Sequence, residues 1–145
     1  MSSCTFFGHR DAPDTIEPDL RAAVIDLIEH KGVDLFYVGN QGAFDRTVIK
    51  TLRLLKEKYP RIKYYVVLAY IPHKKERLAI EDGESTLYPD CLDKTPTKYA
   101  IAKRNMWLIE KSDFVITYVT HISGGAAYFK AIAERKGKKV INITE

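Results

Sequence analysis

The sequence predicts one α/β domain built on a doubly wound parallel sheet. Short apolar runs alternate with amphipathic stretches along the whole chain, which is typical of repeated βαβ units. Glycines also follow three of the apolar runs closely, where a strand must turn toward the next helix. No repeat, low-complexity tract or linker divides the chain, so residues 1–145 are expected to form a single domain.

The composition places few limits on function. The chain carries 23 Lys and Arg against 19 Asp and Glu, a net charge of +4. This charge is compatible with an anionic ligand or nucleic acid, but it is also common among enzymes in general. The two cysteines, Cys4 and Cys91, lack metal-ligand spacing and are expected to be free thiols. With no signal peptide and no long apolar run, the sequence predicts a cytoplasmic protein without a membrane partner.

The first strand is expected at residues 4–7 and ends at Gly8. Thr15 is a candidate cap for the first helix, and Pro18 suits its first turn, where a missing N–H costs little. Gly32 is expected to end this helix. The apolar residues with helical spacing are Leu20, Ala23, Val24, Leu27 and Ile28.

The second strand is expected at residues 33–38 and is followed by Gly39. Gly42 leads into the second helix, which Pro60 closes. The third strand, residues 62–70, is a nearly continuous apolar and aromatic run, which suits a strand covered on both faces.

The second half of the chain begins with residues 71–96, which contain several prolines and a run of charged residues. This segment is expected to be a long loop with one short element. A third helix is expected at 97–111 and a fourth strand at 114–119. The last helix runs from Ser123-Gly124-Gly125 to about residue 136, and the last strand covers 139–143.

These five strands and four helices alternate strictly. Right-handed crossovers then favour the strand order 3-2-1-4-5, in which the chain changes direction between strands one and four. Ligands of open α/β sheets bind in the crevice at such a switch point, beyond the carboxyl ends of the strands. The sequence therefore predicts a ligand site on that rim.

Three glycine-bearing loops leave the strands at the predicted rim. They are Gly8-His9-Arg10, Gly39-Asn40-Gln41-Gly42 and Ser123-Gly124-Gly125. The second and third lead into helix N-termini, where free N–H groups and the helix dipole favour an anion such as phosphate. A phosphorylated small molecule, above all a nucleotide, is the predicted ligand, although neither a Walker-type loop nor the three-glycine dinucleotide fingerprint is present.

Arg10 is the first candidate for binding the phosphate, since a guanidinium can bind a phosphate through two parallel hydrogen bonds. The alternative is an ion pair with Asp11 or Asp14. His9 either donates to a ligand or packs and hydrogen-bonds its own loop, and the sequence leaves both open.

Asp45 lies in the first turn of the second helix, where it either stabilises the helix dipole or contacts ribose hydroxyls. Asn105, next to Arg104, is a poor helix former that either reaches the rim or bonds a loop carbonyl. His73 and His121 could join His9 at a metal, but the spacing is wrong and no carboxylates cluster with them. The sequence therefore predicts neither a metal nor a cofactor.

At the same residues the chain resembles a known group. Phe6 to Arg10 looks like the opening motif of the bacterial SLOG superfamily, in the branch similar to YpsA-type proteins. The stretch 39–45 is similar to the second motif of that branch, which ends in an acid. Residues 103–107 with 112–116, and then 123–125, resemble its later motifs in the right order.

The resemblance implies a Rossmann-like fold that binds a nucleotide or a nucleotide-derived ligand. Wider members include LOG-type phosphoribohydrolases, the single-stranded-DNA-binding protein DprA, and suspected sensors of NAD- or ADP-ribose-like signals in phage and stress responses. Related proteins often pair, so a homo-oligomer is compatible with the resemblance. Carried over by position, the ligand site would comprise Gly8, Arg10, Gly39, Gly42, Asp45, Asn105, Gly124 and Gly125.

One departure concerns catalysis. The LOG-type motif Pro-Gly-Gly-x-Gly-Thr-x-x-Glu supplies the glutamate for cleavage, whereas residues 123–130 here lack the third glycine, the threonine and the glutamate. The leading hypothesis is therefore nucleotide binding, as in a sensor. The alternatives are a nucleoside monophosphate phosphoribohydrolase, with Asp45 as the candidate acid, and single-stranded DNA binding, which basic residues at 56–63 and 135–139 partly support.

Overall fold

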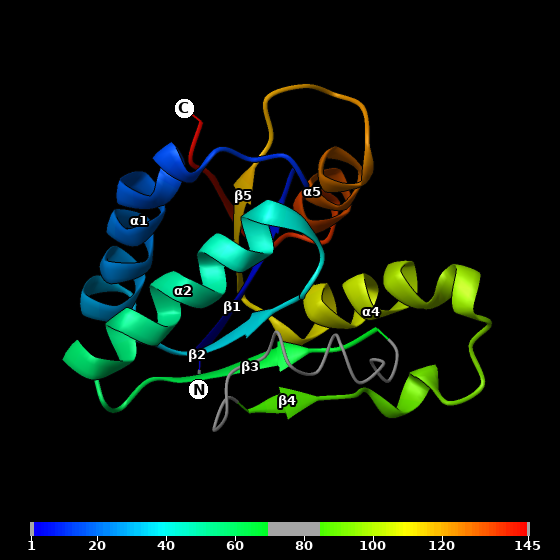
Figure 1. Cartoon of the computed structure of the whole chain (residues 1–145), viewed down its shortest axis with the longest axis horizontal. Helices are drawn as coiled ribbons and strands as arrows, with labels where there is room; N and C mark the ends of the chain where they lie inside the picture. The colour runs from blue at the N-terminus through cyan, green and yellow to red at the C-terminus, as the bar shows by residue number, and fades with distance from the viewer. Residues whose placement is uncertain (1, 70–84, 145) are drawn as a thin grey trace.

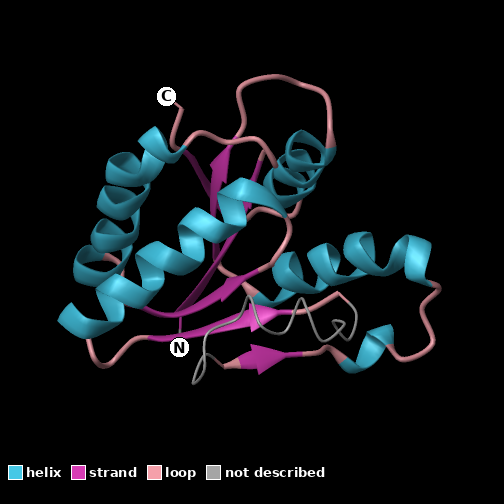
Figure 2. Ribbon diagram, viewed as in Figure 1, coloured by secondary structure: helices cyan, strands magenta, loops and turns pink. Residues whose placement is uncertain are grey.

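The structure is a computed structural model that describes residues 2–69 and 85–144. Within these residues, six parallel strands form one sheet in the order β4-β3-β2-β1-β5-β6 (Figures 1 and 2). The strands are β1 Ser2–Gly8, β2 Val33–Val38, β3 Lys63–Val67, β4 Thr86–Leu87, β5 Phe114–Tyr118 and β6 Lys139–Asn142. The predicted order is confirmed for its five strands, and β4 is an additional edge strand beside β3.

Four helices among the described residues cover the two faces of this sheet. They are α1 Glu17–His30, α2 Gly42–Lys58, α4 Thr97–Lys111 and α5 Gly125–Arg135. The side chains of α1 and α2 share one buried cluster with the sheet, and those of α4 and α5 share another. The domain therefore has the three layers of a doubly wound fold.

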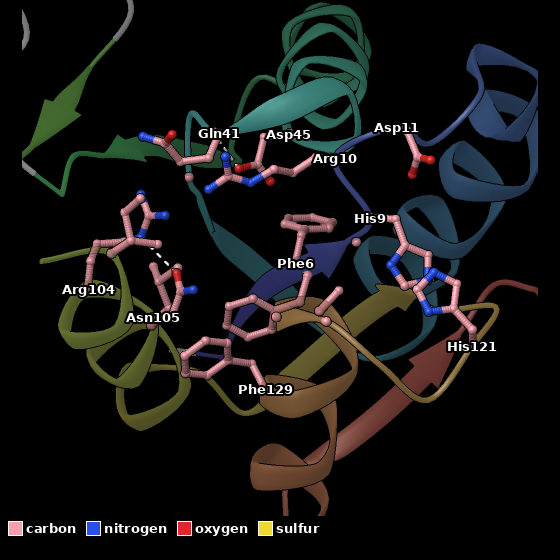
Figure 3. Close-up of a pocket in the computed structure, with 18 residues that line it drawn as sticks. Phe6, His9, Arg10, Asp11, Gln41, Asp45, Arg104, Asn105, His121 and Phe129 are labelled. Carbon is pink, nitrogen blue, oxygen red and sulfur yellow. Dashed lines mark hydrogen bonds between the residues drawn. The ribbon is translucent and has the colours of Figure 1, made fainter. Parts of the chain in front are cut away.

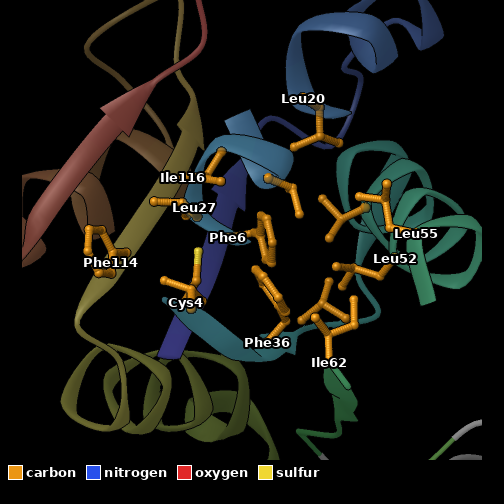
Figure 4. Close-up of a cluster of buried hydrophobic side chains, with 14 of the residues drawn as sticks. Cys4, Phe6, Leu20, Leu27, Phe36, Leu52, Leu55, Ile62, Phe114 and Ile116 are labelled. Carbon is orange, nitrogen blue, oxygen red and sulfur yellow. The ribbon is translucent and has the colours of Figure 1, made fainter. Parts of the chain in front are cut away.

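Alternation along the central strand explains the two clusters. In β1, Phe6 packs into the α1/α2 cluster, whereas Phe7 packs into the α4/α5 cluster. On the first face Phe6 and Phe36 stack with their ring centroids 6.2 Å apart (Figure 4). On the second face Phe7 stacks on Phe129 at 5.6 Å. Both faces of the central strand are thus buried, as its apolar composition requires.

The start of the first helix differs from the prediction. Thr15 does not cap a helix but lies in a one-turn 3-10 helix, Asp14–Ile16, and α1 begins at Glu17 without a side-chain cap. The acids Glu17 and Asp19 lie in its first turn, where they complement the helix dipole. Pro18 lies in the first turn, as predicted.

The third strand is shorter than predicted, because β3 ends at Val67. The chain stays buried at Leu68, whose N–H donates to the carbonyl of Leu87 at 2.8 Å. Of the predicted loop 71–96, residues 71–84 lie outside the described residues. Its described part contains β4 and a 3-10 turn, Asp90–Leu92.

None of the helices in the described ranges is long and apolar enough to span a bilayer.

Candidate functional site

A cavity of about 440 Å³ lies at the carboxyl ends of the central strands. Its walls come from the end of β1 with the loop after it, the loop after β2, the first turn of α2, one side of α4, and the start of α5 (Figure 3). Because β1 lies between β2 and β5, this is the point where the chain switches direction across the sheet. The cavity therefore occupies the place that the topology predicts for a ligand.

Most of the predicted site residues meet at this cavity. Eight of the nine line it, namely Gly8, His9, Arg10, Gly39, Asp45, Asn105, Gly124 and Gly125. Gly42 does not line the cavity. Whether these residues hold a ligand stays a prediction.

Gly42 instead allows two loops to approach each other. Its φ is +92°, and a Cβ there would lie 2.8 Å from the Cα of Arg10. Next to it, the N–H of Ala43 donates to the carbonyl of Arg10 at 2.8 Å. A side chain at Gly42 would push the start of α2 away from the loop that carries Arg10.

Arg10 extends along the rim of the cavity beside Gln41 and Asp45 (Figure 3). Its side chain is exposed. Among the described residues it forms no ion pair, either with Asp11 or with Asp14, the two alternatives that the sequence offered. The guanidinium is therefore available to an anion in the cavity.

Asp45 is buried at the start of α2, with 8% of its surface exposed. Its Oδ2 accepts a hydrogen bond from the N–H of Gln41 at 2.8 Å. A Cβ on Gly39 would lie 2.9 Å from this oxygen and 3.0 Å from Nη1 of Arg104, so both side chains crowd the glycine. The bare backbone of Gly39 makes room for this acid and this arginine.

The environment of Asp45 changes its acidity. Burial raises the pKa of its carboxyl group to about 6, against the opposing effects of the Gln41 N–H and of the nearby charges of Arg104, Arg10 and Arg46. A carboxyl group in this range exchanges its proton near neutral pH, which is a common property of groups in functional sites.

This pKa predicts how stability depends on pH. Because the folded-state pKa is raised from 3.8 to about 6, the folded protein binds this proton more tightly than the unfolded chain. Asp45 then adds stability below its ordinary pKa and loses this contribution as the pH rises through about 6. Between pH 5 and pH 8 the loss is on the order of 1 kcal/mol.

Urea unfolding of the wild type and of Asp45→Asn at pH 5 and pH 8 measures this contribution. The variant lacks the titration, so its stability should change less with pH than that of the wild type. All other titrating groups, including His9, are present in both proteins and cancel in the comparison. Equal pH dependence in the two proteins would contradict the raised pKa.

Arg104 is a buried cation in α4, with 2% of its surface exposed. Its Nη1 donates to the carbonyl of Val67 at 2.8 Å, and its Nε donates to Oδ1 of Asn105 at 2.9 Å (Figure 3). Arg104 lines the cavity together with Asn105. Arg104 thus links the end of β3 to the side chain of Asn105.

The side chain of His9 contacts the loop after β5. Its Nε2 accepts a hydrogen bond from the N–H of Thr120 at 3.0 Å, and its ring stacks on that of His121 at 4.0 Å. Burial and His121 lower the pKa of His9, whereas Asp11 opposes this shift. His9 also lines the cavity, so a contact with a ligand stays a prediction.

The sequence indicated His121 only as a candidate metal ligand and did not predict its stacking on His9. The available signal was that each histidine closely follows one of two strands predicted to be neighbours. Among the described residues, no group of three or more His, Cys, Asp or Glu side chains is placed to hold a metal ion.

The start of α5 forms the opposite part of the rim. Gly124 precedes the helix with a φ of +94°, and a Cβ on Gly124 or Gly125 would meet no atom within 4 Å. The first N–H groups of a helix have no partner within it. This open helix N-terminus at a cavity is an arrangement that suits an anion.

Comparison with known proteins shows a likeness of fold but no match of sequence. No family model matches the sequence, and no curated protein does. Among solved structures, the X-ray structure of DNA processing protein A (DprA) from Streptococcus pneumoniae aligns with a TM-score of 0.70 at 16% sequence identity. The alignment covers 97% of this chain and 49% of that chain, so this chain spans about half the length of DprA. The chain therefore has a Rossmann-like α/β fold similar to that of DprA.

Proposed function

We propose that this protein binds a nucleotide or a nucleotide-derived ligand in the cavity at the carboxyl ends of β1, β2 and β5. The observation that carries the proposal is that Arg10, without an acid partner among the described residues, shares this cavity with the open N-terminus of α5. A guanidinium and free helix N–H groups are two standard partners of a phosphate group.

The rest of the cavity suits the rest of a nucleotide. Its volume of about 440 Å³ is in the usual range for small-molecule sites. Asp45 offers carboxylate oxygens to ribose hydroxyls, and Ile101, Leu108 and Phe129 offer apolar surface to a base. Phosphate, sugar and base thus each have a matching part of the wall.

Membership of the SLOG superfamily, in its YpsA-like branch, is part of this proposal. The order of the sequence motifs supports it, and so does the likeness in fold to DprA, which the sequence resemblance already included among the wider members. In this reading the protein is a sensor whose output depends on occupancy of the cavity.

Calorimetric titration with AMP, IMP, ADP-ribose and NAD tests the proposal. We expect at least one of them to bind and to raise the melting temperature, since a ligand at 100 times its Kd adds about 2.7 kcal/mol to stability. If none of the four binds or shifts the melting temperature, the proposal is wrong.

Hydrolysis of the N-glycosidic bond is a second candidate, favoured by the pKa of about 6 at Asp45. In this reaction a water oxygen bonds to C1′ of the ribose, the bond to the base breaks, and the base leaves with a proton. Incubation with AMP and chromatography for free adenine tests it. Asp45→Asn should abolish any activity found, and retained activity would exclude Asp45 as the acid.

Binding of single-stranded DNA is the third candidate, since the protein with the similar fold is a DNA processing protein. The basic residues that supported it lie away from the cavity. Lys56 and Lys58 end α2, Lys63 begins β3, and the segment 135–139 joins the end of α5 to β6, all at the amino ends of the strands. Salt-dependent retention of an oligonucleotide would support DNA binding, and its absence at low salt would exclude it.

A further inference from the structure

The amide of Asn105 has a defined orientation in the cavity wall. The Nε of Arg104 donates to Oδ1 of Asn105 at 2.9 Å, and an arginine Nε can only donate. Flipping the amide would place two donors together. Oδ1 is therefore turned toward Arg104, and the Nδ2 amino group faces the cavity (Figure 3).

Arg104 is itself held in place. Its Nη1 donates to the carbonyl of Val67, and the side chain is 2% exposed. A buried guanidinium that lost its acceptor at Asn105 would leave a polar group unsatisfied, which is costly. The protein therefore resists a flip of the Asn105 amide that would turn Oδ1 away from Arg104 and toward the cavity.

Asn105 lies in the apolar part of the cavity. Ile101 and Leu108 precede and follow it on the same side of α4, and both line the cavity. Phe129 of α5 lines the same region, where its ring stacks on Phe7 at an interplanar angle of 23°. These walls offer apolar surface to a flat base, and Asn105 lies beside that surface with a polar group.

We propose that Asn105 selects a base that presents an oxo group, such as hypoxanthine or guanine, over a base that presents an amino group, such as adenine. This inference rests on the proposed function, because it names the class of nucleotide that the same cavity takes. An asparagine reads adenine with both amide atoms, since Oδ1 accepts from N6 and Nδ2 donates to N7. Here Oδ1 is turned toward Arg104, so Asn105 presents its Nδ2 donor to the base. An oxo group can accept this hydrogen bond, whereas an amino group, itself a donor, cannot.

Calorimetric titration with IMP and AMP tests this directly, because the two nucleotides differ at C6 of the base, where one has an oxo and the other an amino group. We expect IMP to bind at least about tenfold more tightly, the effect of one hydrogen bond gained against one donor left unpaired. Asn105→Asp keeps an oxygen for Arg104 and turns a second acceptor toward the base. It should remove or reverse the preference for IMP.

Two controls separate this role from a general loss of binding. Arg10→Ala should weaken IMP and AMP by the same factor and leave their ratio unchanged, because the phosphate is common to both. Asn105→Ala, which keeps neither donor nor acceptor, should bring the ratio close to one. It also serves as the test variant if Asn105→Asp fails to fold by circular dichroism.

The possible outcomes separate a failure of this inference from a failure of the proposed nucleotide binding. Equal binding of IMP and AMP by the wild type would overturn the role of Asn105 and leave nucleotide binding intact. A preference for IMP that survives both Asn105 substitutions would overturn it as well. If neither nucleotide binds, while ADP-ribose or NAD does, the base is not read at Asn105. If no ligand binds at all, the proposed function itself fails.

Discussion

Replacing Arg10 with alanine is expected to weaken nucleotide binding by about 100-fold, or about 2.7 kcal/mol, the usual scale for hydrogen bonds between a guanidinium and a phosphate. The guanidinium is exposed at the rim of the cavity and forms no ion pair among the described residues, so binding is the property that it should affect. Stability should change by less than about 0.5 kcal/mol, as for most surface substitutions. Calorimetry measures the affinity, and urea unfolding measures the stability.

Two further variants sharpen this test. Arg10→Lys keeps the charge but loses the planar pair of donors, so its affinity should fall between those of the wild type and Arg10→Ala. Arg135→Ala removes the same charge at the opposite, C-terminal end of α5 and should leave the affinity unchanged. Similar losses in Arg10→Ala and Arg135→Ala would mean that net charge, and not a site at Arg10, governs binding.

Gly8→Ala is expected to cause the largest loss of stability, about 3 kcal/mol, the upper range for overpacking a core. A Cβ on Gly8 would lie 2.3 Å from Cγ of Phe44, which is far inside contact distance. Phe44 has 0% of its surface exposed and stacks near Tyr118 at 6.4 Å, so its ring has little room to move. Either the end of β1 or the start of α2 must shift, and urea unfolding reports the cost.

Gly125 provides a matched control for the Gly8→Ala substitution. Gly125→Ala makes the same substitution where a Cβ meets no atom within 4 Å and φ is not positive, so stability should stay within about 0.5 kcal/mol of the wild type. Combining Gly8→Ala with Phe44→Leu should cost less than the sum of the two single changes, because the smaller side chain relieves the clash. Additive losses in the double variant would show that the contact with Phe44 is not the cause.

Much of the fold follows from local patterns in the sequence. The apolar run of β2 and the helical spacing of α4 give the bounds that the structure has, Val33–Val38 and Thr97–Lys111. The errors arise where the pattern is weak. Thr15 has the right residue type for a cap, yet the chain forms a 3-10 turn there, and the two residues of β4 are too few to show a period.

The meeting of most predicted site residues at one cavity also follows from the sequence, for a topological reason. Once the strands are parallel and in the order found, the loops after β1, β2 and β5 must share one rim. Residues at the ends of strands therefore converge whatever the details of side-chain packing. This is why the positions of Gly8, Gly39 and Gly124 along the chain suffice to predict that they meet.

The sequence thus determines the parallel sheet, the order of its five main strands and the rim that carries the site, because periodicity and chain connectivity are local or topological properties. Only the tertiary structure decides that Gly42 makes room for Arg10, that His9 holds the loop of Thr120, and that Arg104 turns the amide of Asn105. The first two features depend on close approaches between segments that lie far apart in the sequence, and the third depends on the hydrogen bond that holds Arg104 to the carbonyl of Val67. No spacing along the chain encodes these contacts.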